Sequence, residues 1–136
     1  MKKNNAIEVK NLVKTYGDVY ALNDVDLNIS DGEYFVLLGP SGGGKTTLLR
    51  SIGGFIRPDS GSVEIKGKNV NNLPPDKRPT SMVFQGFALF PHMDVAQNIG
   101  YGLKLQTIEQ IIIDEKVNKM MAVSYTHLTL PTTLVV

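Results

Sequence analysis

The sequence predicts an α/β fold in which antiparallel strands precede a buried strand, a glycine loop and a helix. Residues 7–16 and 25–29 alternate apolar with polar residues, as half-buried strands do. Residues 34–38 are continuously apolar and stop at Gly39, which is typical of a central strand buried on both faces. Directly after a cluster of glycines, apolar residues recur at helical spacing in residues 45–52. Strand, glycine loop and helix therefore form the centre of the predicted fold.

Turn and cap residues predict the next elements. The first helix ends at Gly53 and Gly54, because glycine favours the backbone conformation that stops a helix. Residues 58–61 then form a turn, and residues 63–65 form a short strand. The proline-rich residues 74–79 form a connection that cannot be helical inside.

The remaining elements are one strand and two helices. Residues 81–84 are predicted to form a second buried strand. Asp94 is an N-cap residue and opens a predicted helix that runs to Gln106 and carries two glycines, which are unfavourable inside helices. Residues 108–121 are predicted to form a last helix.

Composition and charge exclude several classes of protein. The 136 residues carry 14 Lys+Arg and 13 Asp+Glu, so the net charge of +1 argues against nucleic acid as a partner. A hydrophobic fraction of 42% is that of a globular protein. The absence of cysteine excludes disulfides, zinc–thiolate sites and a thiol nucleophile. No signal peptide and no apolar run of about 18 residues is present, which predicts a soluble, cytoplasmic protein.

The last residues differ in composition from the rest. All 13 glycines lie at or before Gly102, and the last charged residue is Lys119. Residues 123–136 could form an apolar strand broken by a proline. However, most of this segment back-translates without strain to a sequence that resembles the transposase-end adapter used in preparing sequencing libraries. We therefore predict that residues 123–136 are a non-native tail and that residues 1–122 are the natural part.

The glycine cluster fits a phosphate-binding motif. Residues 39–46 satisfy G-x-x-x-x-G-K-[ST] between the predicted strand and helix, a context that a plain glycine turn does not require. Glycines let backbone N–H groups surround phosphates, and the helix N-terminus attracts anions. Lys45 would reach the β- and γ-phosphates, and the Thr46 hydroxyl would ligate Mg²⁺. The residues predicted to bind the nucleotide in this loop are Gly39, Ser41, Gly42, Gly43, Gly44, Lys45, Thr46 and Thr47.

Several motifs occur in the order found in one family. Residues 39–50, 58–61, 82–85 and 88–93 closely resemble the ATP-binding subunit of ABC transporters, and the likeness covers about residues 6–106. Within that family the chain looks most like the importers of polyamines, ferric iron, sulfate and sugars. The resemblance implies a P-loop NTPase fold with an ABC-type nucleotide-binding domain. The chain would hold its N-terminal portion, with an antiparallel β subdomain and part of the parallel core sheet with helices.

The resemblance also implies two further site residues. Tyr16 stands where the family places an aromatic ring that stacks on adenine, whereas a lone tyrosine at a strand end would otherwise be expected to pack. Gln85 stands at the family's Q-loop, where the amide contacts magnesium or the attacking water. Catalytic roles would therefore fall to Lys45 and Gln85, and metal contacts to Thr46 and Gln85, with ATP and Mg²⁺ as cofactors.

An apolar cluster follows Gln85. It consists of Phe87, Leu89, Phe90 and Met93. Such residues are normally core, but an exposed part of them would suit a docking surface for a helix of another subunit. In the family this region lies near the membrane permease. The resemblance implies a homodimer of ATP-binding subunits, permease subunits and an external solute-binding protein as partners, at the inner face of the plasma membrane.

The family's later catalytic motifs do not occur in this sequence. It has no L-S-G-G-Q signature, no apolar strand ending in Asp-Glu and no switch histidine, because His127 lacks the right neighbours. In the family these motifs supply the general base and the charge stabilisation that the opposing subunit provides. Phosphoryl transfer to water needs both contributions. We therefore expect the 136-residue chain to bind nucleotide without turning it over.

The expected function is that of an energy-coupling subunit. The full-length protein would be a transport ATPase that drives solute import, with a polyamine as the first candidate solute and ferric iron as the second. Two alternatives stay open. One is an ABC ATPase without a membrane partner, serving DNA repair or translation. The other is an inactive fragment that binds nucleotide weakly or not at all.

Overall fold

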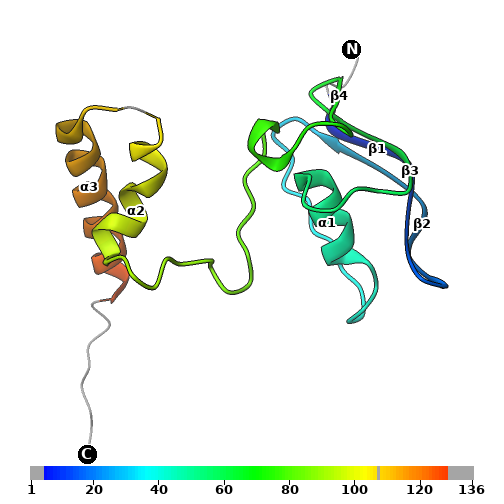
Figure 1. Ribbon diagram of the computed structural model, residues 1–136, viewed down its shortest axis with the longest axis horizontal. Helices are drawn as coiled ribbons and strands as arrows, with labels where there is room; N and C mark the ends of the chain where they lie inside the picture. Colours follow the sequence, from blue (N-terminus) through cyan, green and yellow to red (C-terminus); the bar gives the residue numbers. More distant parts are fainter. Residues whose placement is uncertain (1–4, 107, 129–136) are drawn as a thin grey trace, which may run out of the picture. The chain divides into compact units, whose positions relative to one another are not determined.

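A computed structural model describes residues 5–106 and 108–128 of the chain. Residues 129–136 of the predicted tail lie outside the described residues. The chain divides into two compact units, Met1–Met82, called unit 1, and Val83–Val136, called unit 2. Figure 1 shows the strands in unit 1, whereas unit 2 is helical.

Unit 1 is built on an antiparallel sheet. Its strands have the order β2-β1-β3-β4, so β1 pairs with β2 on one side and with β3 on the other. The strands are β1, Asn5–Tyr16; β2, Val19–Ser30; β3, Ser60–Ile65; and β4, Lys68–Asn69. The antiparallel strands predicted from the alternating pattern are confirmed, and so is the short strand predicted at residues 63–65.

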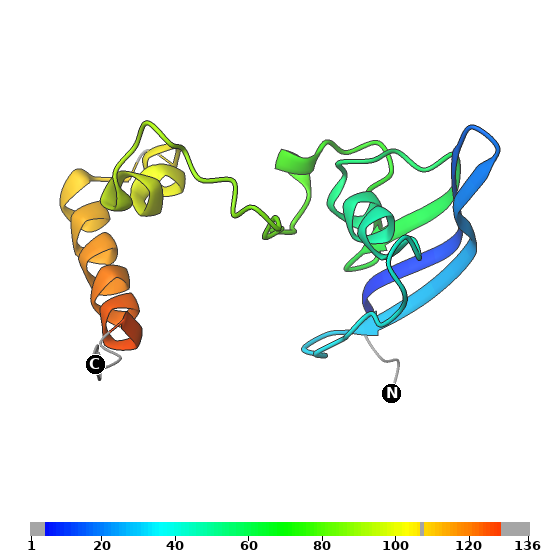
Figure 2. The same cartoon turned by 90° about the horizontal axis from the view of Figure 1, so that it is seen from below.

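One helix covers this sheet and completes the core of unit 1. Helix α1, Lys45–Gly53, lies against one face of the sheet in both views (Figures 1 and 2). The buried core contains residues of the sheet and of α1, together with the residue that follows β4. Its members are Val9, Leu12, Leu22, Leu48, Ile52, Val63, Ile65 and Val70. Burial of apolar side chains between sheet and helix fixes the position of α1. It therefore also fixes the loop that precedes the helix.

The predicted glycine stop of α1 is confirmed. Gly54 adopts a φ of 84°, and its N–H donates to the Ser51 carbonyl at 3.3 Å. The Phe55 N–H donates to the Arg50 carbonyl at 2.8 Å. A Cβ atom at Gly54 would lie 2.6 Å from Nε of Arg78. Glycine is therefore required here both by the left-handed backbone and by the close approach of Arg78.

The two predicted central strands are wrong for this structure. Residues 34–38 and 81–84 form no strand. Tyr34 and Leu38 are 93% and 90% exposed, although Leu37 packs against the core. A parallel strand takes its backbone hydrogen bonds from neighbouring strands. Among the described residues the sheet has the order β2-β1-β3-β4, and neither segment joins it.

The proline-rich connection contains one turn of 3₁₀-helix, Pro75–Lys77, where the sequence predicted none. A proline at the first helical position loses nothing, because that N–H would have no partner anyway. The Arg78 side chain follows and is only 7% exposed. It donates hydrogen bonds to the carbonyls of Leu73, Ser51 and Ile52. The connection is thereby fixed to the C-terminal end of α1.

Unit 2 contains helices α2, Val95–Lys104, and α3, Gln110–Leu128. The predicted N-cap of α2 is confirmed, because the Asp94 carboxylate accepts from the Gln97 N–H at 2.7 Å. The Gln97 side chain accepts in turn from the Asp94 N–H at 3.0 Å, which completes a capping box. Helix α2 ends before the predicted Gln106.

Helices α2 and α3 approach each other at Gly100. A Cβ atom there would lie 3.2 Å from Val117 and 3.3 Å from Ile113, both buried residues of α3. This glycine, unfavourable for helix formation, therefore has a packing role. Helix α3 begins at Gln110 and continues past the predicted end to Leu128, so the described start of the tail is helical and not extended.

Candidate nucleotide-binding site

The glycine loop folds as a tight turn before α1. The Gly43 N–H donates to the Pro40 carbonyl at 3.1 Å, and Gly42 and Gly44 both have a φ of 77°. A Cβ atom at Gly44 would lie 2.3 Å from the Ala21 carbonyl oxygen of β2. No other residue fits at Gly44 without moving backbone, because both the positive φ and the contact with β2 exclude a side chain.

The N-terminus of α1 offers backbone donors. The N-cap residue is Gly44, which has no side chain to accept from the first turn. The first bond of the helical ladder runs from the Leu48 N–H to the Gly44 carbonyl at 2.9 Å. The N–H groups of Lys45, Thr46 and Thr47 precede it and have no carbonyl partner within the helix. Such a helix start binds anions through these donors and through the helix dipole.

The Lys45 side chain lies over the loop. Its Nζ atom donates to the carbonyls of Gly39 at 2.7 Å and Pro40 at 2.5 Å. Thr46 is exposed in the first turn of α1, and Ser41 is exposed in the loop. Residues 39–47 therefore offer N–H groups, an ammonium and hydroxyls, and they contain no carboxylate. This donor set fits a polyphosphate with its magnesium ion.

Tyr16 lies at the end of β1, where it pairs with Val19 of β2. Its side chain is 52% exposed, and Nζ of Lys14 lies over the ring, 5.6 Å from the centroid. The strand that pairs with Tyr16 also carries Ala21, whose carbonyl contacts the loop at Gly44. The structure thus brings Tyr16 to the hairpin that abuts the phosphate loop, with ring surface accessible to a ligand.

Gln85 lies in unit 2, in the turn formed by residues 85–88, and is exposed. The prediction that it closes a buried strand is wrong, because no strand precedes it. The phosphate loop and Tyr16 belong to unit 1. The contacts described for them therefore do not include Gln85.

The apolar cluster after Gln85 is largely exposed. Phe87 and Leu89 are 73% and 67% exposed, while Met93 is half-buried. The Phe90 ring packs on Tyr101 of α2, with centroids 4.5 Å apart. The interpretation of this cluster as core therefore does not hold for Phe87, Leu89 or Phe90, because Phe90 is itself 36% exposed despite its contact with Tyr101.

Asn98 organises the same segment and was missed by the sequence analysis. Its Oδ1 accepts from the Phe90 N–H at 2.9 Å. Its Nδ2 donates to the carbonyls of Phe90, Met93 and Asp94. The position of Asn98 in the sequence could have predicted this role. Asn98 lies four residues after the N-cap Asp94, on the same face of the helix, so its side chain can bond to the residues at the helix start.

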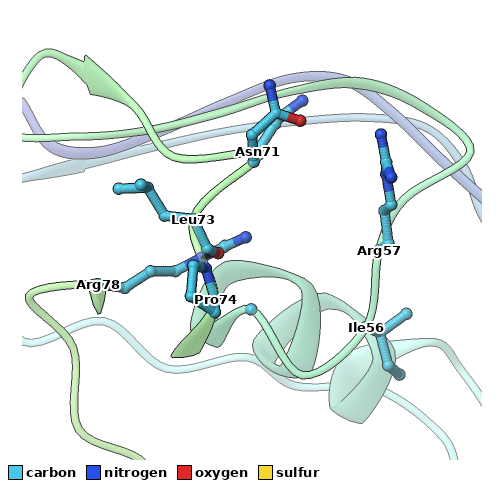
Figure 3. A pocket seen from close by; sticks show the side chains of 8 residues that line it. Ile56, Arg57, Asn71, Leu73, Pro74 and Arg78 are labelled. Carbon is cyan, nitrogen blue, oxygen red and sulfur yellow. Dashed lines mark hydrogen bonds between the residues drawn. The ribbon is translucent and has the colours of Figure 1, made fainter. Parts of the chain in front are cut away.

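A cavity of about 260 Å³ in unit 1 lies apart from this loop. Figure 3 shows Arg57, Asn71 and Arg78 among the side chains around it. No residue of the phosphate loop lines it. Among the side chains that the structure describes, no group of three His, Cys, Asp or Glu could hold a metal ion.

A comparison with known protein families shows to which family the chain belongs. Residues 22–132 match the family described as ABC transporter, which covers more than half of the chain. The chain belongs to the ABC transporter family. The matched range includes the phosphate loop, α1 and Gln85, whereas Tyr16 precedes it.

Curated members of the family show close sequence similarity. The spermidine/putrescine import ATP-binding protein PotA of Pseudomonas fluorescens (strain Pf0-1) is 51% identical over 121 residues, which are 86% of this chain and 34% of that protein. The protein of the same name from Roseobacter denitrificans is 54% identical over 101 residues, 74% of this chain and 28% of that protein. The chain thus spans about a third of the length of the curated relatives it matches.

Solved ABC cassettes share the fold. A dimeric cassette in a post-hydrolysis state, bound to ADP and Pi, matches with a TM-score of 0.74 and 32% identity over 83% of this chain and 54% of that chain. A dimeric bacterial ABC transporter cassette matches with a TM-score of 0.72 and 34% identity over 80% of this chain and 53% of that chain. These likenesses confirm the predicted ABC-type P-loop fold. None of the helices in the described part of the chain could cross a membrane.

Proposed function

We propose that the chain binds ATP with magnesium at residues 39–47, as the ATP-binding part of an ABC importer subunit. The observation that carries the proposal is the geometry of the loop. Glycines at positive φ place the backbone against β2, and the first N–H groups of α1 have no helical partner. Membership of the ABC transporter family supports the same function.

Each loop group has a distinct task in holding the nucleotide. The N–H groups at the start of α1 bind phosphate oxygens through hydrogen bonds that need no reorganisation. Lys45 exchanges its bonds to Gly39 and Pro40 for the β- and γ-phosphates. The Thr46 hydroxyl holds the magnesium ion, which neutralises phosphate charge when bound. Tyr16 stacks on adenine, and Gln85 orients the metal or the attacking water.

Hydrolysis belongs to the full-length protein. Its rate depends on a base that acts on the water and on charge supplied by a second ATP-binding subunit. The dimeric state of the solved cassettes supports a homodimer. We therefore assign ATP binding to this chain and the transport ATPase activity to the longer protein.

A polyamine is the first candidate for the imported solute, and ferric iron is the second. The curated relatives named for spermidine and putrescine import support this order. The exposed Phe87 and Leu89, with Phe90 and Met93 beside them, form the proposed docking surface for permease subunits. The working location is cytoplasmic, on the inner face of the plasma membrane, with an external solute-binding protein as an indirect partner.

The native part of the chain is proposed to be residues 1–122, an N-terminal portion of the ABC ATP-binding domain. Residues 123–136 are proposed to be a non-native tail. Sequencing the genomic DNA beyond codon 122 tests this boundary. A reading frame that continues into the missing catalytic motifs supports it, whereas a native codon sequence for residues 123–136 contradicts it.

Calorimetric titration with Mg-ATP tests the proposed binding site. Lys45→Ala is expected to abolish binding, because the β- and γ-phosphates lose their main side-chain counter-ion. Lys68→Ala is the matched control, since Lys68 is an exposed lysine on β4, outside the loop. Equal affinity of the Lys45 variant and the native chain would refute the assignment.

Copurification tests the importer role. The full-length protein is co-expressed with permease subunits of an ABC importer, and the permease is detected after affinity purification. Phe87→Ser is expected to reduce recovery of the permease, while Val95→Ser, at another exposed apolar position, retains it. Uptake of labelled spermidine or ferric iron by vesicles from these cells distinguishes the two solutes. A protein that binds ATP and recovers no permease would favour an ABC ATPase without a membrane partner.

A further inference from the structure

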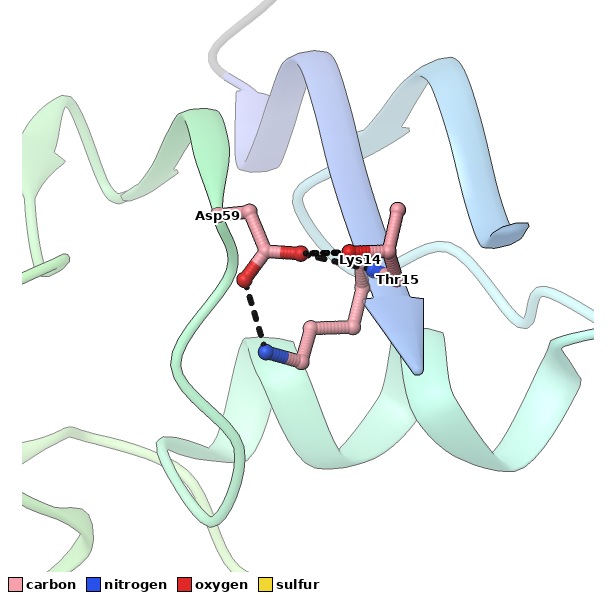
Figure 4. A network of polar contacts seen from close by, with 3 residues as sticks. All are labelled: Lys14, Thr15 and Asp59. Atoms are coloured by element: carbon pink, nitrogen blue, oxygen red, sulfur yellow. Dashed lines mark hydrogen bonds and ion pairs between the residues drawn. The ribbon is translucent and has the colours of Figure 1, made fainter. Parts of the chain in front are cut away.

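Asp59 holds the end of β1. It lies in the turn between α1 and β3, and its own N–H donates to the Val13 carbonyl at 2.8 Å. Its Oδ1 accepts from Nζ of Lys14 at 2.8 Å (Figure 4). Its Oδ2 accepts from the N–H of Thr15 at 2.7 Å and from the Thr15 hydroxyl at 2.9 Å. One residue thus bonds to the three consecutive residues that immediately precede Tyr16.

The same ammonium that Asp59 binds lies over the Tyr16 ring. Nζ of Lys14 is 5.6 Å from the ring centroid, within the range of a cation–π contact. The ring remains half exposed. With the ammonium over one face of the ring, a flat partner can stack on the opposite face. Asp59 is therefore linked to one face of the Tyr16 ring through the Lys14 ammonium.

We infer that Asp59 is a positioning residue for the nucleotide, which orients Tyr16 toward the base of bound ATP through Lys14 and Thr15. This inference rests on the proposed function. The orientation matters because Gly44 of the phosphate loop contacts Ala21, on the strand that pairs with Tyr16. A displaced end of β1 alters the position of the ring relative to the phosphates. The loop itself keeps its contacts with β2 and α1.

The charge of Asp59 is stable over the pH range of binding measurements. Hydrogen bonds from Lys14 and then Thr15 lower the pKa of its carboxyl from 3.8 to about 2. The carboxylate therefore accepts all three bonds at neutral pH. Asn in its place keeps an acceptor for Thr15 and presents no charge to Lys14.

Two ligands separate positioning of the base from binding of the phosphates. The native chain and Asp59→Asn are titrated with Mg-ATP and with magnesium tripolyphosphate, which has no base. The variant is expected to bind ATP about fivefold or more weakly and to bind tripolyphosphate with unchanged affinity. Asp76→Asn is the control, because Asp76 is an exposed carboxylate, away from Tyr16 in sequence, whose ion pair with Lys77 spans 3.7 Å. It is expected to change neither affinity.

A double-mutant cycle tests whether Asp59 acts through Tyr16. The chain with both Asp59→Asn and Tyr16→Ala is expected to bind ATP no more weakly than Tyr16→Ala alone. Additive losses, or an equal loss of tripolyphosphate affinity in Asp59→Asn, would overturn the positioning role and leave the proposed function intact. A native chain that binds neither ligand would overturn both.

Circular dichroism shows whether Asp59→Asn folds. If it does not fold, a second variant tests the inference. Lys14→Gln removes the ammonium from the ring and leaves the bonds between Asp59 and Thr15. It is expected to weaken ATP binding and to spare tripolyphosphate binding. Unchanged ATP affinity in this folded variant would overturn the role of Lys14 in the inference.

Discussion

Arg78 donates a hydrogen bond from Nη1 to the carbonyl of Ser51 at 2.8 Å, and the same nitrogen reaches the Ile52 carbonyl at 2.9 Å. The last carbonyls of a helix have no partner within the helix, so a guanidinium at this end satisfies them and complements the helix dipole. Burial lowers the pKa of the Arg78 side chain. The segment after β4 is thus tied to the helix that follows the phosphate loop.

Arg78→Met is expected to lower the free energy of unfolding by about 2 kcal/mol or more. The substitution removes a donor from three carbonyl groups, two of them in buried bonds, although the Ser51 carbonyl keeps the Gly54 N–H. Urea unfolding followed by circular dichroism measures the change. Arg57→Met is the control, because the exposed Arg57 side chain lies beside the same cavity (Figure 3). A loss no larger than in the control would contradict a stabilising role for Arg78.

Asp59 is expected to make the fold sensitive to acid. The pKa of its carboxyl is lowered from 3.8 to about 2, chiefly by the hydrogen bond from Lys14. Its contribution to stability is therefore present above about pH 3.8 and is lost as the pH falls toward 2. Urea unfolding at a series of pH values should show that the free energy of unfolding falls less in this window for Asp59→Asn than for the unsubstituted chain. Parallel curves for the two proteins would refute this dependence.

Tyr16→Ala is expected to weaken ATP binding by about 1 to 3 kcal/mol, the contribution of stacking between a base and an aromatic ring. Tyr16→Phe should be nearly neutral, because stacking uses the ring and not the hydroxyl. Calorimetric titration of the native chain and both variants measures the difference. If phenylalanine were as damaging as alanine, the hydroxyl would be making the contact.

The 136-residue chain is expected to bind ATP without hydrolysing it. Holding the ground state does not lower the barrier unless a group acts on the water, and loss of a general base alone costs about 10² to 10⁴ in rate. Phosphate release is measured for the native chain and for Lys45→Ala. A Lys45-dependent rate on the order of 1 per second, as ordinary ATPases show, would demonstrate a base that the sequence analysis missed.

Short-range patterns were sufficient for several parts of the fold. Alternating apolar residues predicted β1 and β2, and the glycine motif placed the start of α1 at Lys45. Asp94 predicted the N-terminus of α2 because its cap bonds reach only to Gln97. In each case the interactions that define the element lie within a few residues or repeat with a fixed period. The local sequence is therefore sufficient to predict such interactions.

The remaining features depend on partners that are distant in the sequence. Residues 34–38 have the composition of a central strand, yet strand formation requires backbone hydrogen bonds to a neighbouring strand, and this segment joins no sheet among the described residues. The bonds from Arg78 to Ser51 and from Lys14 to Asp59 arise only when the chain folds back on itself. A residue's type shows what it can donate or accept. Tertiary structure decides which distant group lies within hydrogen-bonding distance.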